Sequence, residues 1–431
     1  MTRRLNTKDA GFELAFLQLL GDKREQSVDV NSAVASILDD VRKRGDVAVH
    51  EYTRQFDGFD LPASGARISS DDIVRYAKQC EPSIFAALEQ AASRIRSYHE
   101  RQLPTNERYR DAAGVELGHR WSAVQAAGLY VPGGLAAYPS SVLMNAIPAR
   151  VAGVERLVMV VPTPNGIINA QVMAAAQIAG IDEIYTIGGA QAIGALAYGT
   201  QTIVPVTKIV GPGNAYVAAA KKQVFGTVGI DMIAGPSEVL VMADDTANAS
   251  WVAADLLAQA EHDTSAQSIL VCTSARFADD VALAVESQLR TLPKADIASE
   301  SWKNFGCIIL VDNLMDAVEL VDRLAPEHLE IVSENAEQVA SAIHNAGAIF
   351  IGQFTPEAVG DYVGGPNHVL PTARSARYSS GLNVLDFMKR TSILKCSADA
   401  LRIIGPDAIT IGRAEGLEAH ARSVAMRLNL P

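Results

Sequence analysis

Residues 183–225 read EIYTIGGAQAIGALAYGTQTIVPVTKIVGPGNAYVAAAKKQVF and carry the clearest structural signal in the chain. Short β-branched runs at 183–187 and 208–210 predict strands. Each is followed by a glycine-rich turn and an alanine-rich helix, at 190–198 and 215–225. Strands that alternate with helices of roughly ten residues are typical of βαβ units in a parallel sheet. The stretch therefore predicts an α/β fold.

The same alternation continues on both sides of this stretch. A strand is predicted at 157–161 and a helix at 168–179, and the two α/β halves are expected to join near residue 240. The segment at 352–381 is rich in glycine and proline and is expected to be too irregular for the core. The second half is predicted to contain strands at 268–272, 307–311, 329–332 and 348–351 and helices at 249–260, 278–289, 315–324 and 335–345.

The overall charge excludes several classes of partner. The 431 residues include 37 basic and 49 acidic side chains, which gives a net charge of −12. An acidic surface repels nucleic-acid phosphates and anionic lipids, so neither is an expected partner. The longest apolar runs stop short of the roughly 18 residues that a membrane span needs. The N-terminus has no apolar signal-peptide core. We therefore expect a cytoplasmic protein.

The cysteines argue against two common motifs. The four cysteines lie far apart, with no C-x-x-C pair. This spacing excludes a zinc ribbon and a thioredoxin-like motif, and it fits a reducing compartment. Cys272 and Cys307 lie in apolar, strand-like runs. We predict that both are buried and inert rather than nucleophilic.

Three glycine-rich turns follow predicted strands: VPGG at 131–134, IGGAQ at 187–191 and VGPGN at 210–214. In parallel sheets, ligands bind where strands end, and the backbone N–H groups of such turns can approach a phosphate. The third turn has Tyr216 where the last glycine of a G-x-G-x-x-G fingerprint would stand. Plain βα connections also use glycine, so nucleotide binding stays a hypothesis at this point.

A polar stripe on the predicted helix at 249–260 is a possible ligand set. Asp255, Gln259 and His262 lie at offsets of zero, four and seven residues, so they share one face. Gln259 and His262 have the i, i+3 spacing that supplies two metal or substrate ligands in helical proteins. A solvated helix face gives the same pattern. A solvated face therefore remains an open interpretation of this stripe unless further ligands converge on Gln259 and His262.

Further candidate ligands lie later in the chain. Asp361 and His368 fall in a glycine-rich loop, and Glu415 and His420 stand at the start of a predicted C-terminal helix. One acid and one imidazole added to the helical pair would make a nitrogen and oxygen set that suits zinc, manganese or cobalt. Asp361 could instead be a turn residue that bonds its own backbone. The remaining histidines are expected to be surface or structural residues: His50, His99, His119 and His344.

An acid and an imidazole stand side by side at Glu327 and His328, just after Pro326. On a regular strand, adjacent side chains point to opposite faces, so both can serve one site only where the backbone is irregular. Proline makes such an irregularity plausible. Two bases of different pKa would suit a reaction with two proton abstractions. The alternative is a helix-ending loop with two solvated residues.

Taken together, these motifs resemble the histidinol dehydrogenase family. The matching segments run in the family's order from about residue 120 to 420 and cover most of the chain. They are GLYVPGG (128–134), IGGAQAI (187–193), VGPGN (210–214), AGPSEV (234–239), AQAEHD (258–263), APEHL (325–329), GDY (360–362), NHVLPT (367–372) and EGLEAH (415–420).

The resemblance implies a reaction and a set of site residues. It implies oxidation of L-histidinol to L-histidine through L-histidinaldehyde with two NAD⁺, the final step of histidine biosynthesis. His328 would be the base for the alcohol, and Glu327 would activate the water that hydrates the aldehyde. One Zn²⁺ per subunit would be held by Gln259, His262, Asp361 and His420. NAD contacts would come from Tyr130, Gln191 and Asn214, and the substrate would also be held by Ser237, His328 and Glu415.

The resemblance also implies an architecture. It predicts two parallel-sheet, incomplete Rossmann-like domains with small N- and C-terminal helical extensions that are used in a homodimer with a shared active site. The NAD-binding domain is placed at 126–237, and the domain with most metal and catalytic residues at 23–125 plus 238–381. The extensions are an N-terminal helical arm at 1–22 and a C-terminal dimerisation tail at 382–431.

Three other functions are consistent with parts of the pattern. Another NAD-dependent alcohol or aldehyde dehydrogenase is possible, although an aldehyde dehydrogenase would need a reactive cysteine as acyl carrier. A metal-dependent hydrolase would need no nucleotide. A non-catalytic nucleotide-binding module would use the glycine-rich turns alone.

Overall fold

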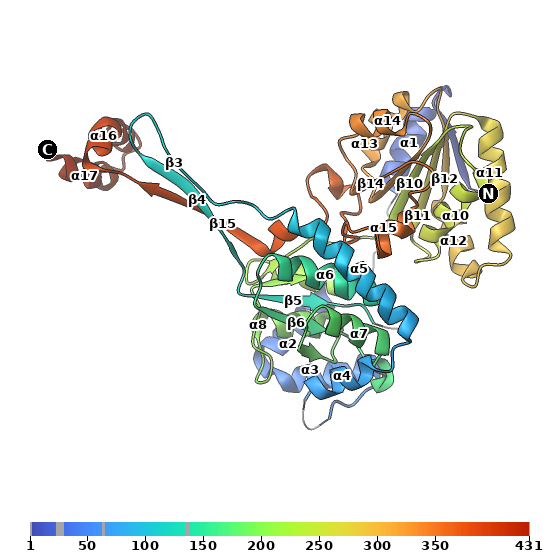
Figure 1. Cartoon of the computed structure of the whole chain (residues 1–431), viewed down its shortest axis with the longest axis horizontal. Helices are drawn as coiled ribbons and strands as arrows, with labels where there is room; N and C mark the ends of the chain where they lie inside the picture. The colour runs from blue at the N-terminus through green and yellow to red at the C-terminus, as the bar shows by residue number, and fades with distance from the viewer. Residues whose placement is uncertain (1, 23–29, 63–64, 134–137, 431) are drawn as a thin grey trace.

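The computed structural model of the chain contains two α/β domains and an elongated arm (Figure 1). Gly134, the last residue of the predicted turn at 131–134, lies outside the part that it describes. The described residues are 2–22, 30–62, 65–133 and 138–430.

The first domain is built on a sheet with the strand order β2-β7-β6-β5-β8-β9, in which only β2 runs antiparallel to its neighbour. Its central strands are almost wholly apolar and buried, as expected for parallel strands that are covered on both faces. The strands are β2 (Arg67–Ile68), β5 (Ala126–Tyr130), β6 (Arg156–Val160), β7 (Glu183–Tyr185), β8 (Lys208–Val210) and β9 (Gly229–Ile230).

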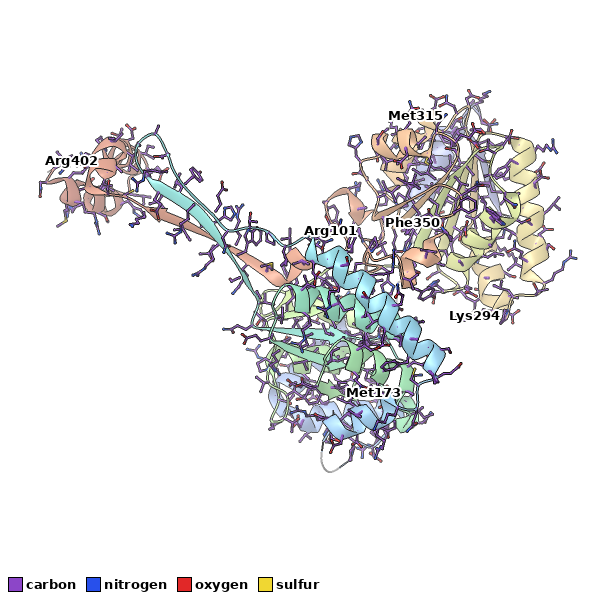
Figure 2. The ribbon with its side chains drawn as sticks, viewed as in Figure 1. Arg101, Met173, Lys294, Met315, Phe350 and Arg402 are labelled. Atoms are coloured by element: carbon purple, nitrogen blue, oxygen red, sulfur yellow. The ribbon has the colours of Figure 1, made fainter. Side chains whose placement is uncertain are left out.

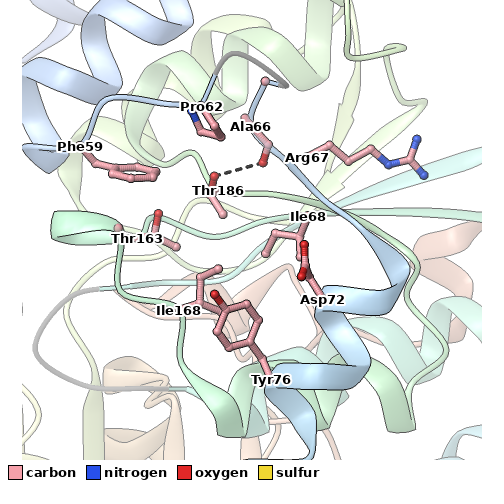
Figure 3. Close-up of a pocket in the computed structure, with 12 residues that line it drawn as sticks. Phe59, Pro62, Ala66, Arg67, Ile68, Asp72, Tyr76, Thr163, Ile168 and Thr186 are labelled. Carbon is pink, nitrogen blue, oxygen red and sulfur yellow. Dashed lines mark hydrogen bonds between the residues drawn. The ribbon is translucent and has the colours of Figure 1, made fainter.

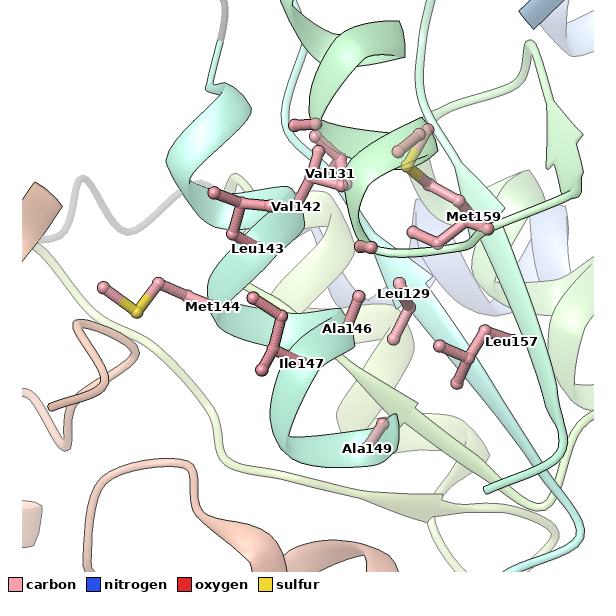
Figure 4. Close-up of a cluster of buried hydrophobic side chains, with 14 of the residues drawn as sticks. Leu129, Val131, Val142, Leu143, Met144, Ala146, Ile147, Ala149, Leu157 and Met159 are labelled. Atoms are coloured by element: carbon pink, nitrogen blue, oxygen red, sulfur yellow. The ribbon is translucent and has the colours of Figure 1, made fainter. Parts of the chain in front are cut away.

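Within the described ranges, eight helices cover the two faces of this sheet. On one face, Leu143 and Ile147 of α6 pack against Leu129 and Leu157 of the central strands (Figure 4). The alternate residues of the same strands form a second core with the helices of the other face. The first face carries α4 (Ser70–Ala77), α5 (Pro82–Glu100), α6 (Pro139–Val151) and α7 (Ala170–Ile178), and the second carries α2 (Asn31–Arg44), α3 (Asp46–Asp57), α8 (Gly189–Tyr198) and α9 (Ala215–Val224).

The second domain has a fully parallel sheet with the order β1-β12-β11-β10-β13-β14. Its strands are β1 (Arg3–Asn6), β10 (Glu238–Ala243), β11 (Gln267–Cys272), β12 (Cys307–Leu310), β13 (His328–Val332) and β14 (Ala348–Ile351). Its helices are α1 (Phe12–Gly21), α10 (Ala249–Ala260), α11 (Ala275–Leu289), α12 (Ala295–Phe305), α13 (Val318–Leu324), α14 (Ala336–Ala342) and α15 (Glu357–Tyr362). Separate cores lie on the two faces of the sheet, one beside α1 and α13 and the other beside α10 and α11.

The arm extends from the first domain as an antiparallel sheet of β3 (Glu107–Arg110), β4 (Glu116–Ala123) and β15 (Met388–Lys395). None of the residues in these three strands is buried. At its tip, α16 (Ala398–Ala414) and α17 (Glu418–Ala425) pack on each other around a small core at Ile409, Ala421 and Ala425.

The observed elements confirm the predicted α/β class and its two parallel sheets, but two segments pack differently from the expectation. Residues 31–100 pack mainly on the sheet of the first domain, where α2 contacts α8 and α9, although Arg94 of α5 also donates to the carbonyls of Val363 and Gly364. Residues 2–21 do more than form a helical arm, because β1 pairs with β12 at the edge of the second sheet. No helix within the described ranges is long and apolar enough to cross a membrane.

Candidate active site and metal centre

The backbone before β13 is irregular, as the proline predicted. Ala325 ends α13 in the left-handed region with φ 46°, and Glu327 and His328 follow as buried residues. The backbone of one residue, Glu238, holds both side chains. The N–H of Glu238 donates to Glu327 Oε2 at 2.9 Å, and the carbonyl of Glu238 lies 3.0 Å from His328 Nδ1. The solvated-loop interpretation of this pair is therefore wrong.

His328 is surrounded by carboxylates. Its Nε2 lies 3.6 Å from Asp361 Oδ1, and its Nδ1 lies 3.6 Å from Glu357 Oε1. The ligand atoms of His328, Glu357 and Asp361 all lie within 4.8 Å of one another, which makes this a possible metal-binding group. Burial lowers the pKa of His328, but Glu357, Glu327 and Asp361 outweigh it and raise the pKa to about 10.

Glu357 is a member of this cluster that the sequence analysis missed, because 352–381 was expected to lie outside the core. It begins α15 and is only 2% exposed, and burial raises its pKa to about 8. A usable signal was present in the sequence. Glu357 and Asp361 are four residues apart, so a short helix places both on one face.

Two further acids lie next to this cluster, the buried Glu330 and the half-buried Asp255. Glu330 Oε1 accepts a hydrogen bond of 2.6 Å from the backbone N–H of Glu357. The side chain of Glu330 also hydrogen-bonds to Asp255, which belongs to the polar stripe on α10. Burial raises the pKa of Glu330 to about 9 and that of Asp255 to about 6. The stripe thus reaches the sheet instead of facing only solvent.

Gln259 and His262 lie at the end of α10, beside this cluster. Gln259 is 1% exposed, and its Oε1 is buried without a hydrogen-bond partner among the described residues. His262 follows the helix and interacts electrostatically with Asp361. A buried amide oxygen without a partner, close to an imidazole and a carboxylate, is the donor set that a zinc ion accepts. The residues present therefore fit a metal.

The loop after α15 connects the two domains at this point. His368 Nδ1 lies 2.9 Å from the carbonyl of Asp361, and its Nε2 lies 3.4 Å from Ser141 Oγ on α6. Asn367 donates to the carbonyl of Met144 on the same helix at 2.6 Å. These contacts bring the acid cluster of the second domain against the first domain.

Two predicted site residues lie elsewhere in the chain. Glu415 and His420 are exposed at the tip of the arm, where α16 and α17 meet. In Figure 2, Arg402 of α16 marks this tip, far from Phe350, whose ring centroid lies 6.1 Å from that of His328. One chain alone does not bring Glu415 and His420 to the other candidates.

The predicted NAD residues gather at the carboxyl edge of the first sheet. The hydroxyl of Tyr130 accepts a hydrogen bond of 3.1 Å from the N–H of Gly189, at the start of α8. Burial raises the pKa of Tyr130 to about 12. Gln191 lies in the first turn of α8. Asn214 caps α9 by accepting from the N–H groups of Tyr216 and Val217.

A cavity of about 160 Å³ lies beside this edge (Figure 3). Thr163 and Thr186, which follow β6 and β7, line it together with the rings of Phe59 and Tyr76. The hydroxyl of Thr186 donates to the carbonyl of Ala66 at 3.1 Å. The cavity therefore combines apolar walls with hydroxyl groups at the ends of parallel strands, a common location of nucleotide sites.

The thiols are buried as predicted. Cys272 and Cys307 are both fully buried in the second sheet. Burial raises the pKa of Cys272 to about 11 and that of Cys307 to about 12. A thiol with a raised pKa is a poor nucleophile, so neither cysteine is suited to carry an acyl group.

Comparison with known proteins agrees with this geometry. The family described as histidinol dehydrogenase matches residues 21–428. The histidinol dehydrogenase of Bradyrhizobium diazoefficiens is 63% identical over 430 residues, and that of Rhizobium meliloti is 61% identical. Each comparison covers the whole of this chain and at least 99% of the relative. The crystal structure of histidinol dehydrogenase from Elizabethkingia anophelis superposes with a TM-score of 0.95 at 36% identity, covering 99% of this chain and 98% of that one. The chain therefore belongs to the histidinol dehydrogenase family.

Proposed function

We propose that this oxidoreductase converts L-histidinol to L-histidine through L-histidinaldehyde, with two NAD⁺ used in turn at one site. The observation that carries the proposal is that the backbone N–H and carbonyl of Glu238 hold Glu327 and His328 side by side, next to Asp361. Two bases at one position suit two successive oxidations, each of which needs a proton removed.

His328 takes the proton of the substrate hydroxyl. The carbonyl of Glu238 accepts from Nδ1, which leaves Nε2 as the basic nitrogen. Carboxylates raise the pKa of His328, and a metal ion held by Asp361 would weaken that effect. The ring is oriented before the substrate arrives because its position is fixed by β13.

Glu327 activates the water that adds to the aldehyde. The N–H of Glu238 holds one carboxylate oxygen, so the side chain is oriented in a buried site. Loss of the proton from water to Glu327 gives the hydrated aldehyde, whose C–H hydrogen leaves as the second hydride. No thioester is needed in this route, in agreement with the buried thiols.

Gln259, His262 and Asp361 would hold the metal, together with the partner subunit's His420. When bound, Zn²⁺ orients the substrate through its nitrogen atoms. The buried, unpartnered Oε1 of Gln259 supports this assignment. Ser237, which directly precedes β10, holds the substrate next to these ligands. The partner subunit's Glu415 holds it as well.

The arm supports a shared site in a homodimer. Its strands lack a covered face, and its tip carries Glu415 and His420 on an exposed surface. A twofold arrangement would let each arm pack on the other subunit and deliver both residues to that subunit's site. The C-terminal tail is then the dimerisation element.

NAD is bound at the carboxyl edge of the first sheet by Tyr130, Gln191 and Asn214. When bound, it accepts the hydride. The cavity lined by Thr163 and Thr186 lies at the same edge of the sheet and offers room for part of the dinucleotide. We also propose that the protein is cytoplasmic and has no membrane partner.

Removal of the metal tests the proposal. Chelation is expected to lower histidine formation at least about tenfold, because the substrate loses its orienting ligand. Added Zn²⁺, Mn²⁺ or Co²⁺ should restore the product, identified as L-histidine by mass spectrometry. NADH binding, measured by its fluorescence, should survive chelation because the dinucleotide residues lie in the other domain. Full activity in a metal-free preparation would contradict the proposal.

A further inference from the structure

A buried ion pair lies directly under the turn that carries Asn214. Lys221 of α9 and Asp231, which follows β9, form this pair, and their side chains are 3% and 1% exposed. Both side chains also form hydrogen bonds with the backbone of one residue, Gly211. The N–H of Gly211 donates to Asp231 Oδ2 at 2.8 Å, and Lys221 Nζ donates to the carbonyl of Gly211 at 2.9 Å.

Gly211 is the residue at which the chain leaves β8. Its φ is +110°, and a Cβ at this position would lie 2.2 Å from the carbonyl oxygen of Tyr130. The turn is therefore pressed against the backbone of Tyr130 on one side. Asp231 continues the line of β9 on the other side, where its carboxylate takes the place of a strand carbonyl. The pair thus fixes the turn from the side opposite to Tyr130.

The pair also sets the direction of α9. Asn214 caps this helix, and Lys221 lies seven residues later, two turns along the same face. The hydrogen bond from Lys221 to the carbonyl of Gly211 therefore connects α9 directly to the end of β8, across the turn that joins them. Any shift of the turn would break two hydrogen bonds to buried charges, which are among the stronger bonds in proteins.

We propose that Lys221 and Asp231 are positioning residues for the dinucleotide: they clamp the backbone N–H and carbonyl of Gly211 and thereby hold Asn214 where it meets NAD. The inference rests on the proposed NAD site and names two residues that do not themselves touch the ligand. Without the clamp, the turn samples other positions, and part of the binding free energy of NAD is lost in ordering it.

The test is the double substitution Lys221→Met/Asp231→Asn. It removes both charges together, so no unpaired charge is left in the core. The amide introduced at position 231 can still accept from the N–H of Gly211, whereas the donor to the Gly211 carbonyl is lost. We expect the Kd for NADH, titrated by fluorescence, and the KM for NAD⁺ to rise about tenfold, the effect of about one hydrogen bond. The KM for histidinol and kcat at saturating NAD⁺ should change less than about twofold.

Two controls separate positioning from general destabilisation. Lys222→Met changes the exposed neighbour and should leave NADH binding unchanged. Arg156→Met/Glu183→Gln removes a bidentate ion pair at the opposite edge of the same sheet. It should lower the Tm without raising the Kd for NADH. A Kd raised equally by this control and by the clamp variant would overturn the inference.

The outcomes also distinguish the inference from the proposed function. If wild-type protein binds NADH and Asn214→Ala weakens that binding, the NAD site stands. A clamp variant that then binds NADH as tightly as wild type overturns the positioning role alone. If Asn214→Ala has no effect, the proposed NAD site fails, and the inference that depends on it fails as well.

Discussion

Glu327→Gln is expected to abolish oxidation of the aldehyde while sparing its reduction. The amide cannot accept a proton from water, so formation of L-histidine from L-histidinaldehyde and NAD⁺ should fall by about 10²- to 10⁴-fold. Reduction of the same aldehyde by NADH to histidinol uses His328 and needs no added water, so it should stay within a few-fold of wild type. Both rates are followed by NADH absorbance.

Two variants complete this experiment. His328→Asn should slow aldehyde reduction strongly, since the imidazole is the proton carrier of that half-reaction. Glu334→Gln changes an exposed acid just after β13 and should behave as wild type. Equal losses in both half-reactions for Glu327→Gln would contradict the assignment of separate roles to the two residues.

Mixed dimers of His262→Ala and His420→Ala chains are expected to regain activity that neither variant has alone. His262 lies at the end of α10, whereas His420 is carried by the arm, so a shared site takes them from different subunits. In a mixed dimer, one site then has both substitutions and the other has none. Random pairing should restore about a quarter of the wild-type activity.

A second mixture provides the matched control. Gln259 and His262 come from the same helix end, so a mixed dimer of Gln259→Ala and His262→Ala chains has one defect in each site. This mixture should stay as inactive as its parents. Absence of recovery in the first mixture, although mixed dimers are isolated, would contradict a site shared across subunits.

The alternating pattern of strands and helices was sufficient to predict most of the second domain. The prediction for α10 at 249–260 and for β14 at 348–351 matches the structure residue for residue. Local periodicity fixes such elements because each strand is apolar and each helix begins at a polar cap, as Asn248 does for α10. The packing of residues 31–100 depends on which sheet they meet, and no local signal specifies that.

The location of the cluster around His328 was harder to predict than that of the glycine-rich turns. The general expectation places ligands at the carboxyl ends of strands, and the glycine-rich turns of the first domain obey it. In the second domain, His328 begins β13 and Glu238 begins β10, so this cluster lies at the amino edge. A crossover helix runs antiparallel to its strands, so the end of α10 also reaches that edge. Gln259, in the last turn of α10, therefore lies toward the same edge of the sheet as His328.

Glu357 is the residue of the cluster that the sequence did not reveal. It lies in the segment 352–381, which was expected to be irregular, but its side chain is buried. Glycine and proline indicated a loop, and they do end α15 after six residues. Burial of Glu357 depends on Glu330 and His328, which come from a strand far away in the sequence. Such contacts are set by tertiary packing, so composition alone predicted the loop and missed its acid.

The number of NADH molecules formed per L-histidinol consumed tests the central claim most directly. The enzyme is incubated with limiting L-histidinol and excess NAD⁺, and NADH is measured by absorbance at completion. The proposed pair of bases, used in two successive oxidations, predicts two NADH for each substrate, with L-histidine as the product. One NADH with accumulated aldehyde would indicate a simple alcohol dehydrogenase, and no NADH would indicate a different reaction; either result would contradict the account.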